Sequence, residues 1–468
     1  MQRLTTPRAL VALAAAACAA WFSLLSVLHH DAFETGRFDL GNMVQVVWST
    51  AHGHFLRMTN TQGEQVSRLA AHVDPILALF APLWWIWPSP HMLLVVQAVV
   101  VAAGAFPVFA LARKHLASER AALGFALVYL VLPATQWLTL NEFHPVALAC
   151  PFLLYAFRYL DDDRLVPFAV FAVLAAATKE EIALVVAGFG VWYALARRRR
   201  AAGTAIVAVG ALWFALAVGV VVPHFNHGGT SSFYSRYREV GGSPGGVLRT
   251  AVTHPLRILD KAFDGRSLRY LADLAIPLAG LFLAAPLALV AALPELALNL
   301  LSSVKTQTSI RFHYTAGLIP PLVVASVLGA ARLSGRSRSR AVAIVALVLA
   351  VALVENARLG ALFKAPASVS RHDRIAAHAL RLVPDDADVS ATNTLGAHLS
   401  ARRRILSFPR LRDATWLAVD STRLSYLDRS TGGKPAARTL TRLRRNQGWR
   451  VVFARDGVLI FRRVGAQR

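Results

Sequence analysis

Charged residues are scarce in this sequence. They make up 16% of its 468 residues, whereas hydrophobic residues make up 56%, and soluble domains usually carry about a quarter of charged residues. The composition therefore excludes an ordinary soluble protein and indicates an integral membrane protein. Acidic residues are especially few, 26 against 50 Lys and Arg. Such an excess of Arg is typical of cytoplasmic loops and lipid headgroup contacts, and no stretch combines aromatic and basic residues as single-strand binders do, so we expect no nucleic acid partner.

Cysteine is nearly absent. The two cysteines, Cys18 and Cys150, both lie inside hydrophobic runs. This excludes a disulfide framework and a zinc site built from paired cysteines. Internal repeats and low-complexity tracts are also missing, although Gly241 to Gly246 is typical of a flexible loop.

Long hydrophobic runs are what the sequence has in abundance. The first, Ala9 to Leu28, is long enough for a retained transmembrane helix, with a cleaved signal peptide as the alternative. A shorter run, Pro75 to Trp87, holds three Trp and favours an interfacial or re-entrant helix. The remaining predicted spans lie at 91–112, 120–138, 146–160, 165–178, 182–196, 203–222, 271–291, 292–304, 315–331 and 341–358. The predicted fold is an all-α polytopic membrane domain with about 11 transmembrane helices, over residues 1–358.

The positive charges predict the orientation. Arg3 and Arg8 precede the first span and indicate a cytoplasmic N-terminus, because Lys and Arg concentrate in cytoplasmic loops. Alternate loops then hold the basic residues Arg113, Lys114, Arg120, Arg158, Arg164, Arg197 to Arg200, Arg332, Arg336, Arg338 and Arg340. Eleven crossings leave the C-terminus outside the cell membrane.

Residues 359–468 differ in character from the rest. Long hydrophobic runs stop, and the segment holds 21 Lys and Arg against 8 Asp and Glu. Short apolar runs at 388–391, 416–419, 450–453 and 457–461 predict strands, and 371–382 predicts a helix. We expect a small, basic, extracytoplasmic α/β domain.

The same topology puts most motif-like polar residues on the outer face, with the first external loop at 29–90. Asp39 is the candidate for chemistry there, although Asp is also a common helix N-cap and 40–50 looks helical. The other candidates for substrate binding are His72, Asp74, Glu142, His144, Lys179, Glu180, Arg236, Tyr237, Arg238, Lys305, Arg311, His313 and Tyr314.

Each cluster also has a simpler explanation. His72, Asp74 and Pro75 are typical of a helix start. Glu142 and His144 by themselves are too few ligands for a metal site, so no metal ligand is assigned. A divalent metal remains an open possibility. Lys179 and Glu180 could be a local ion pair, and the Arg and Tyr residues of 236–238 and 311–314 could be membrane-interface residues.

A resemblance rests on motifs spread over nearly the whole chain. They are Phe38-Asp39-Leu40-Gly41 with Gln45 and Trp48, His72-x-Asp74-Pro75, Pro82-Leu83, Gln97, Phe143-His144-Pro145, Lys179-Glu180, Pro294-Glu295 with Asn299-Leu300-Leu301, Tyr314 and Val389 to Asn393. The sequence resembles a family of predicted bacterial membrane proteins of unknown function. That family in turn resembles the GT-C superfamily of membrane glycosyltransferases, which use sugars linked to polyprenyl phosphate.

The resemblance implies an inverting glycosyltransferase with Asp39 as the first-loop carboxylate. GT-C proteins often carry a second, adjacent acidic residue, which is missing here. Cations at headgroup level would stabilise the leaving lipid phosphate, and Arg311 is the first choice among Arg236, Arg238, Lys305 and Arg311. The expected partners are membrane lipids and the donor lipid. A transporter or flippase and a non-catalytic scaffold are the alternative functions.

Overall fold

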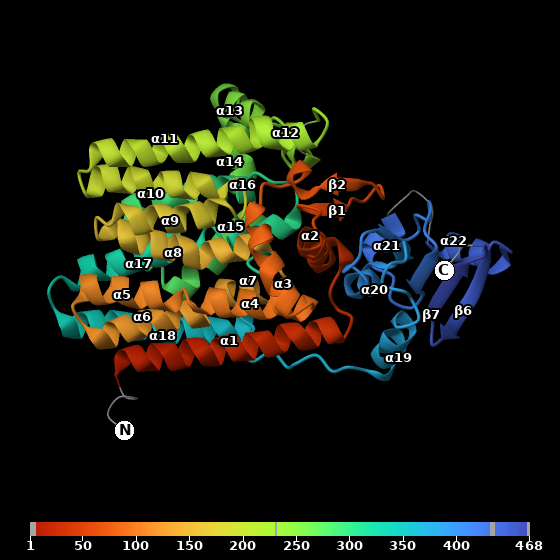
Figure 1. The fold of residues 1–468 in the computed structure, drawn as a ribbon. Coiled ribbons are helices and arrows are strands. Elements are labelled where there is room, and N and C mark those ends of the chain that lie inside the picture. Colours follow the sequence, from red (N-terminus) through yellow and green to blue (C-terminus); the bar gives the residue numbers. More distant parts are fainter. Residues whose placement is uncertain (1–5, 230–231, 431–435, 466–468) are drawn as a thin grey trace.

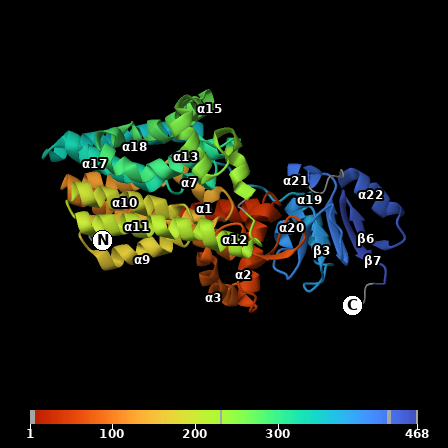
Figure 2. The same cartoon turned by 90° about the horizontal axis from the view of Figure 1, so that it is seen from above.

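The computed structural model describes residues 6–229, 232–430 and 436–465. Figure 1 shows a bundle of roughly parallel and antiparallel helices on one side and a small sheet with its own helices, drawn in blue, on the other. The segments between α1 (Pro7–Asp31) and α4 (Pro90–Ala102) lie between the two, as the view from above also shows (Figure 2). Arg3, used for the orientation, lies outside the described residues.

The bundle holds the predicted spans. Among the described residues, four apolar helices are long enough to cross a membrane, at Pro7–Asp31, Pro90–Leu116, Arg200–Phe225 and Arg338–Leu359. The pair Glu119–Val131 and Pro133–Leu140, bent by 47°, would make a fifth. The helices of the bundle are α1 (Pro7–Asp31), α4 (Pro90–Ala102), α5 (Ala105–Leu116), α6 (Glu119–Val131), α7 (Pro133–Leu140), α8 (Ala149–Asp161), α9 (Leu165–Ala176), α10 (Ile182–Ala196), α11 (Arg200–Leu216), α12 (Val222–Phe225), α13 (Pro244–Thr253), α14 (Pro255–Ala262), α15 (Gly265–Ala275), α16 (Leu293–Leu300), α17 (Ile319–Ser334) and α18 (Arg338–Leu359). The fold class is as predicted, and the number of crossings stays a prediction.

One predicted boundary is wrong. The spans expected at 271–291 and 292–304 do not meet at residue 291, because the turn Pro286–Ala292 continues directly into α16. The chain breaks earlier, where Ala279 and Gly280 are left-handed, with φ of 49° and 62°. Pro286 then prevents the preceding residue from continuing a helix. Since the residues around the break are apolar, hydropathy alone could not locate it.

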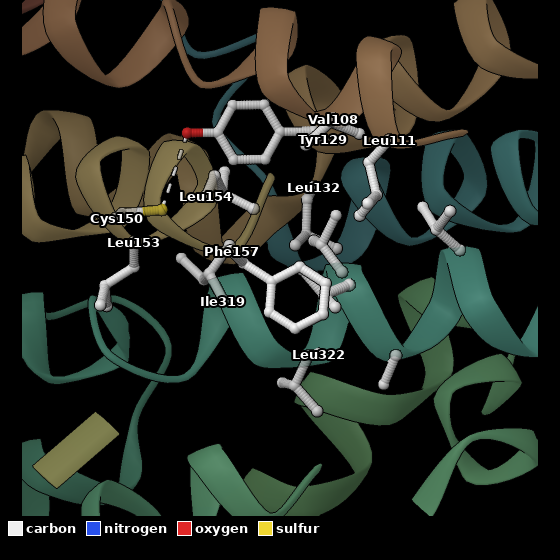
Figure 3. Close-up of a cluster of buried hydrophobic side chains, with 14 of the residues drawn as sticks. Val108, Leu111, Tyr129, Leu132, Cys150, Leu153, Leu154, Phe157, Ile319 and Leu322 are labelled. Atoms are coloured by element: carbon white, nitrogen blue, oxygen red, sulfur yellow. Dashed lines mark hydrogen bonds between the residues drawn. The ribbon is translucent and has the colours of Figure 1, made fainter. Parts of the chain in front are cut away.

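The bundle core is tightly packed around buried aromatic side chains. Figure 3 shows Tyr129 of α6 above Cys150 and Phe157 of α8, with Ile319 of α17 beneath them. The Tyr129 hydroxyl donates to the carbonyl of Val101 at 2.7 Å and lies 3.6 Å from the Cys150 sulfur. The buried phenol therefore has partners, as a buried polar group requires.

Helices α10 and α11 approach closely at glycines. A Cβ on Gly203 would lie 2.6 Å from the carbonyl oxygen of Gly190, and one on Gly210 would lie 2.6 Å from that of Ala183. Side chains at these positions would force the helices apart. Small residues of this kind are typical of contacts between helices in membranes.

The first loop is folded on its own core. A π-helical turn, η2 (Arg37–Gly41), leads into α2 (Asn42–Ala51), which packs with the antiparallel hairpin β1 (Arg57–Thr59) and β2 (Gln65–Ser67). The run expected to be interfacial forms a 3₁₀ turn, η4 (Pro75–Phe80), and α3 (Ala81–Ile86). Trp85 and Ile86 of α3 are 68% and 81% exposed, as suits a helix at a membrane surface.

The C-terminal unit is a five-stranded mixed sheet with helices. Its strand order is β4-β3-β5-β7-β6, with β3 parallel to β4 and β5 and with β7 antiparallel to β5 and β6. The predicted strands and the predicted helix are present, and β4 was missed. The elements are α19 (Arg371–Leu380), β3 (Val389–Ala391), α20 (Asn393–His398), β4 (Ile405–Ser407), β5 (Trp416–Asp420), α21 (Tyr426–Ser430), α22 (Ala436–Arg445), β6 (Trp449–Arg455) and β7 (Val458–Arg463).

Candidate functional site

Asp39 lies in the middle of the η2 turn. Its carboxylate is 3.6 Å from the Nε2 atom of His144, and 49% of its side chain is exposed. Burial favours a higher pKa, but the nearby imidazole of His144 and the charge of Arg68 outweigh it and hold the pKa of Asp39 below its usual value. The alternative that Asp39 caps a helix is wrong, because α2 begins after Gly41 without a side-chain cap. Asp39 is thus an ionised carboxylate that is open to its surroundings.

Glu142 fixes the turn that carries Asp39. Its two carboxylate oxygens accept hydrogen bonds from the backbone N–H groups of Gly36 at 3.0 Å and of Leu40 at 2.8 Å. Burial and the charge of Asp39 raise the pKa of Glu142 to about 8, against the lowering effect of these two hydrogen bonds. Gln97 holds the segment of Glu142 in turn, since its side chain bonds the Glu142 carbonyl and the His144 N–H. Glu142 was predicted to bind substrate, but its oxygens are used within the protein.

A polar cavity of about 440 Å³ opens beside Asp39. Its walls come from η2, the first-loop hairpin, and loops at the end of the bundle. Seven predicted site residues line it, namely Asp39, His72, His144, Lys179, Arg236, His313 and Tyr314. Residues separated by up to 275 positions in the sequence are thus brought to one cavity.

A second cavity of about 300 Å³ adjoins the first. Its lining is mainly apolar and includes Leu184 of α10, Phe214 of α11 and Leu298 of α16. It also includes the predicted residues Glu180 and Tyr237 and the carboxylates of Glu181 and Glu295. The two cavities share five lining residues: His72, Lys179, Phe233, Arg236 and Tyr314. We call these five residues the shared wall. The shared wall separates the polar cavity from the apolar cavity, and it carries the positive charges of Lys179 and Arg236.

Ion pairs hold the shared wall. Glu180 pairs with His72 Nδ1 at 2.9 Å and accepts the N–H of Val73 at 2.9 Å, while Lys179 pairs with Glu181. Burial opposes the charged forms, but the neighbouring opposite charges outweigh it, so the pKa of Glu180 is lowered and that of Lys179 is raised. Both side chains are therefore ionised. The ion pair considered from the sequence, between Lys179 and Glu180, is not formed, because each of the two side chains pairs with a different partner.

Arg236 is held by aromatic rings and weak polar contacts. Its guanidinium carbon lies 4.4 Å from the ring centre of Phe233 and 5.9 Å from that of Tyr314. Its Nη1 donates to Gln307 and to the Tyr314 hydroxyl, each at 3.4 Å. No carboxylate pairs with Arg236 among the ion pairs of the described residues. Its charge is positioned but not neutralised by a direct partner.

Two histidines close the polar cavity. His144 and His313 stack with ring centres 3.8 Å apart, and both contact Asn141. Burial, followed by the charges of His144 and Lys179, lowers the pKa of His313 well below its usual value. His313 is therefore neutral at physiological pH and leaves the positive charge of the cavity to other residues.

Other predicted residues lie elsewhere. Asp74 is buried in an ion pair with Arg68, 2.7 Å from its Nη2, so it stabilises the loop instead of lining a cavity. Burial raises the pKa of Asp74, with Arg68 opposing the effect. Arg238, Lys305 and Arg311 are exposed and line neither cavity. Arg311 lies over the ring of Trp137, 5.4 Å from its centre.

Some lining residues were not foreseen from the sequence. Arg68, Asn42 and Phe233 line the polar cavity, and Phe233 also forms part of the shared wall. The one usable signal was Arg68, a charged residue shortly before the Asp74-Pro75 pair. Within residues 6–229, 232–430 and 436–465, no three His, Cys, Asp or Glu side chains are grouped as a metal ion would need.

Solved structures with the same fold are known. The crystal structure of ArnT from Cupriavidus metallidurans bound to undecaprenyl phosphate matches with a TM-score of 0.55 and 14% identity, over 98% of both chains. The structure of the same protein in the apo state matches with a TM-score of 0.51 and 13% identity, over 96% of both chains. No curated protein sequence matches the chain. ArnT is a GT-C glycosyltransferase, so the predicted GT-C-like fold is confirmed.

The fold, its apolar helices and the cavities at one end of the bundle define a multi-pass membrane protein of the GT-C fold class. The chain belongs to the family described as Predicted membrane protein (DUF2079), whose pattern matches residues 29–460. This match confirms the predicted family over nearly the whole length.

Proposed function

We propose that this protein is a membrane glycosyltransferase that transfers a sugar from a polyprenyl-phosphate donor to an acceptor outside the cytoplasm. The observation that carries the proposal is the shared wall, where two cations separate an apolar cavity from a polar cavity that contains Asp39. A sugar on a lipid phosphate needs this sequence of environments. The similarity of the fold to ArnT, whose structure was solved with undecaprenyl phosphate, supports the same assignment.

The apolar cavity would receive the first part of the lipid tail. Its lining includes Leu184 of α10, Phe214 of α11, Val218 of the π-helical segment Ala217–Val221 that follows α11, and Leu298 of α16. Prenyl groups are as apolar as this lining, so they can pass from the bilayer into the cavity without exposing apolar surface to water. The rest of the tail would remain in the bilayer, which explains why the transferase is embedded in a membrane.

The phosphate would lie at the shared wall. When the bond between the sugar and the phosphate breaks, the lipid phosphate gains negative charge, and preorganised cations stabilise that charge. Arg236 suits this role because its guanidinium can hold two phosphate oxygens. In the described part of the chain, it also has no carboxylate partner that the phosphate would have to displace. Lys179 is the second candidate, although Glu181 competes for its charge. The geometry therefore favours Arg236 over Arg311, which lies outside both cavities.

Asp39 would act as the general base. The acceptor hydroxyl attacks the anomeric carbon from the side opposite the phosphate, and its proton passes to Asp39. The bond between the anomeric carbon and the phosphate oxygen breaks, so the configuration at the anomeric carbon is inverted. An ionised carboxylate that faces the cavity is suited to this step. The products are the glycosylated acceptor and the free polyprenyl phosphate.

The orientation follows from the basic loops. With the N-terminus in the cytoplasm, the cavities and the C-terminal unit are outside, so the acceptor would be a component of the cell envelope. The polar cavity, at about 440 Å³, has room for a sugar and part of an acceptor.

Binding of polyprenyl phosphate tests the proposal. Arg236→Ala in lipid nanodiscs should weaken this binding by roughly 10- to 100-fold, since a hydrogen bond between charged groups contributes about 1.5–3 kcal/mol. Arg238→Ala, an exposed Arg two residues further along the same turn, is the matched control and should bind like wild type. Arg311→Ala should also bind normally.

The same titration separates the alternatives. Equal affinity of wild type, Arg236→Ala and Lys179→Ala would refute the assignment of the shared wall. Binding of the lipid without release of sugar from a labelled pool of polyprenyl-phosphate sugars would favour a lipid transporter.

A further inference from the structure

We infer that the C-terminal unit is part of the reaction machinery, because Arg37, Asn393 and Ser407 hold the turn that carries Asp39. These three are positioning residues, not catalytic ones. The inference rests on the proposed role of Asp39, and it changes the role of the C-terminal unit from an accessory domain to a support for the general base.

Arg37 makes the central contact. Although charged, it is only 1% exposed. Its Nη1 donates to the Ser407 hydroxyl at 2.6 Å, and its Nη2 donates to the carbonyls of Ile405 at 2.7 Å and Thr59 at 2.8 Å. A buried guanidinium is costly unless such partners are present. Arg37 therefore ties η2 to strand β4 and to the first-loop hairpin at once.

Asn393 makes the second contact. Its Oδ1 accepts the N–H of Phe38 at 3.2 Å, and its own N–H donates to Asp428 at 2.8 Å. The contact is close, because a Cβ on Gly36 would lie 2.7 Å from the Asn393 amide nitrogen. On the other side, a Cβ on Gly396 of α20 would lie 3.0 Å from the Arg37 side chain. Glycine at both positions lets the two backbones approach.

The η2 turn is thus held from two directions. Glu142 of the bundle accepts the N–H groups of Gly36 and Leu40. The C-terminal unit binds the side chain of Arg37 and the N–H of Phe38. Between these anchors, the Asp39 carboxylate faces the polar cavity. A shift of the C-terminal unit would therefore move Asp39, while Lys179 and Arg236 of the shared wall, which lie outside the first loop, would stay.

This difference gives a test. Replacing Arg37 itself could prevent folding, so Asn393→Ala and Ser407→Ala are the informative variants, made in the full chain in nanodiscs. Ser421→Ala is the matched control, because the Ser421 hydroxyl likewise makes a short hydrogen bond, which it donates to the carbonyl of Gly457 at 2.8 Å, and the described residues show no hydrogen bond between Ser421 and η2.

Two measurements are made on each variant. Hydrogen exchange of the peptide that covers 36–41 should become about tenfold faster in Asn393→Ala and Ser407→Ala, and not in Ser421→Ala. Turnover of labelled polyprenyl-phosphate sugar should fall about tenfold in the first two variants, with the affinity for polyprenyl phosphate within twofold of wild type. Unchanged exchange, or equal effects in Ser421→Ala, would overturn the inference. An inactive wild type would refute the proposed function, and the exchange result would still decide whether the C-terminal unit holds the turn.

Discussion

Raising the pH should loosen the turn that carries Asp39. The perturbation is a change from pH 6 to pH 8, and the responsible group is Glu142, whose pKa is raised from 4.5 to about 8 by burial and by the charge of Asp39. Between pH 4.5 and pH 8, Glu142 is protonated in the native protein. It is ionised in the opened state, in which the turn no longer covers it. The free energy of opening therefore falls as the pH rises through this window, and the stabilisation is complete only below pH 4.5.

The structure sets the size of the effect. One unit of pKa difference corresponds to about 1.4 kcal/mol, so the change from pH 6 to pH 8 should cost about 2 kcal/mol. That energy is roughly a 30-fold change in an equilibrium constant. Once ionised, Glu142 repels Asp39 while its oxygens still accept the N–H groups of Gly36 and Leu40.

Hydrogen exchange at pH 6, 7 and 8, corrected for the intrinsic rate, measures this effect. Protection of the 36–41 amides should fall roughly 30-fold in wild type. In Glu142→Gln, which cannot ionise, the starting protection should be lower and the pH dependence flat. Parallel pH dependences of wild type and Glu142→Gln would refute the reasoning.

Three further outcomes are expected. Asp39→Asn should insert and bind polyprenyl phosphate normally but lose about 10²- to 10⁴-fold in turnover, the usual contribution of a general base, and full turnover in this variant would exclude that role. Gly203→Val should lower the free energy of unfolding in detergent by about 1–3 kcal/mol, because its side chain overpacks against Gly190. An unchanged melting temperature would show that α10 and α11 can separate freely. Cysteines placed in 370–460 should react with an impermeant label from outside and those in 332–340 should not, and the reverse pattern would invert the proposed orientation.

The sequence was most informative where one physical property decides the structure. Hydrophobic runs predicted the helical bundle, because a membrane-spanning segment must be apolar over its length. The same property failed at residues 279–286, where backbone conformation breaks an apolar stretch without changing its hydropathy. Strand β4 was missed, and its position depends on pairing with β3, which no local sequence pattern reports.

The candidate site shows a similar division. Topology predicted which residues share a face, and seven of them line one cavity. It could not predict which side chains of a turn point inward. Arg236 and Arg238 are two residues apart in a 3₁₀ helix with three residues per turn, so they point in different directions, and only Arg236 reaches the cavity. Likewise, the sequence identified Glu142 as a candidate site residue. It could not show that the side-chain oxygens of Glu142 accept hydrogen bonds from the backbone N–H groups of Gly36 and Leu40.

The short helix α3 has a consequence for the height of the reaction relative to the bilayer. Trp85 of α3 donates its indole N–H to the carbonyl of Ala51, the last residue of α2, and α2 begins directly after the η2 turn. A helix of ten residues is a rigid spacer of about 15 Å. A change in lipid thickness that shifts the exposed Trp85 and Ile86 would therefore act on the η2 turn through α2, against the anchors of Glu142 and the C-terminal unit, so the bilayer itself would bear on the position of Asp39.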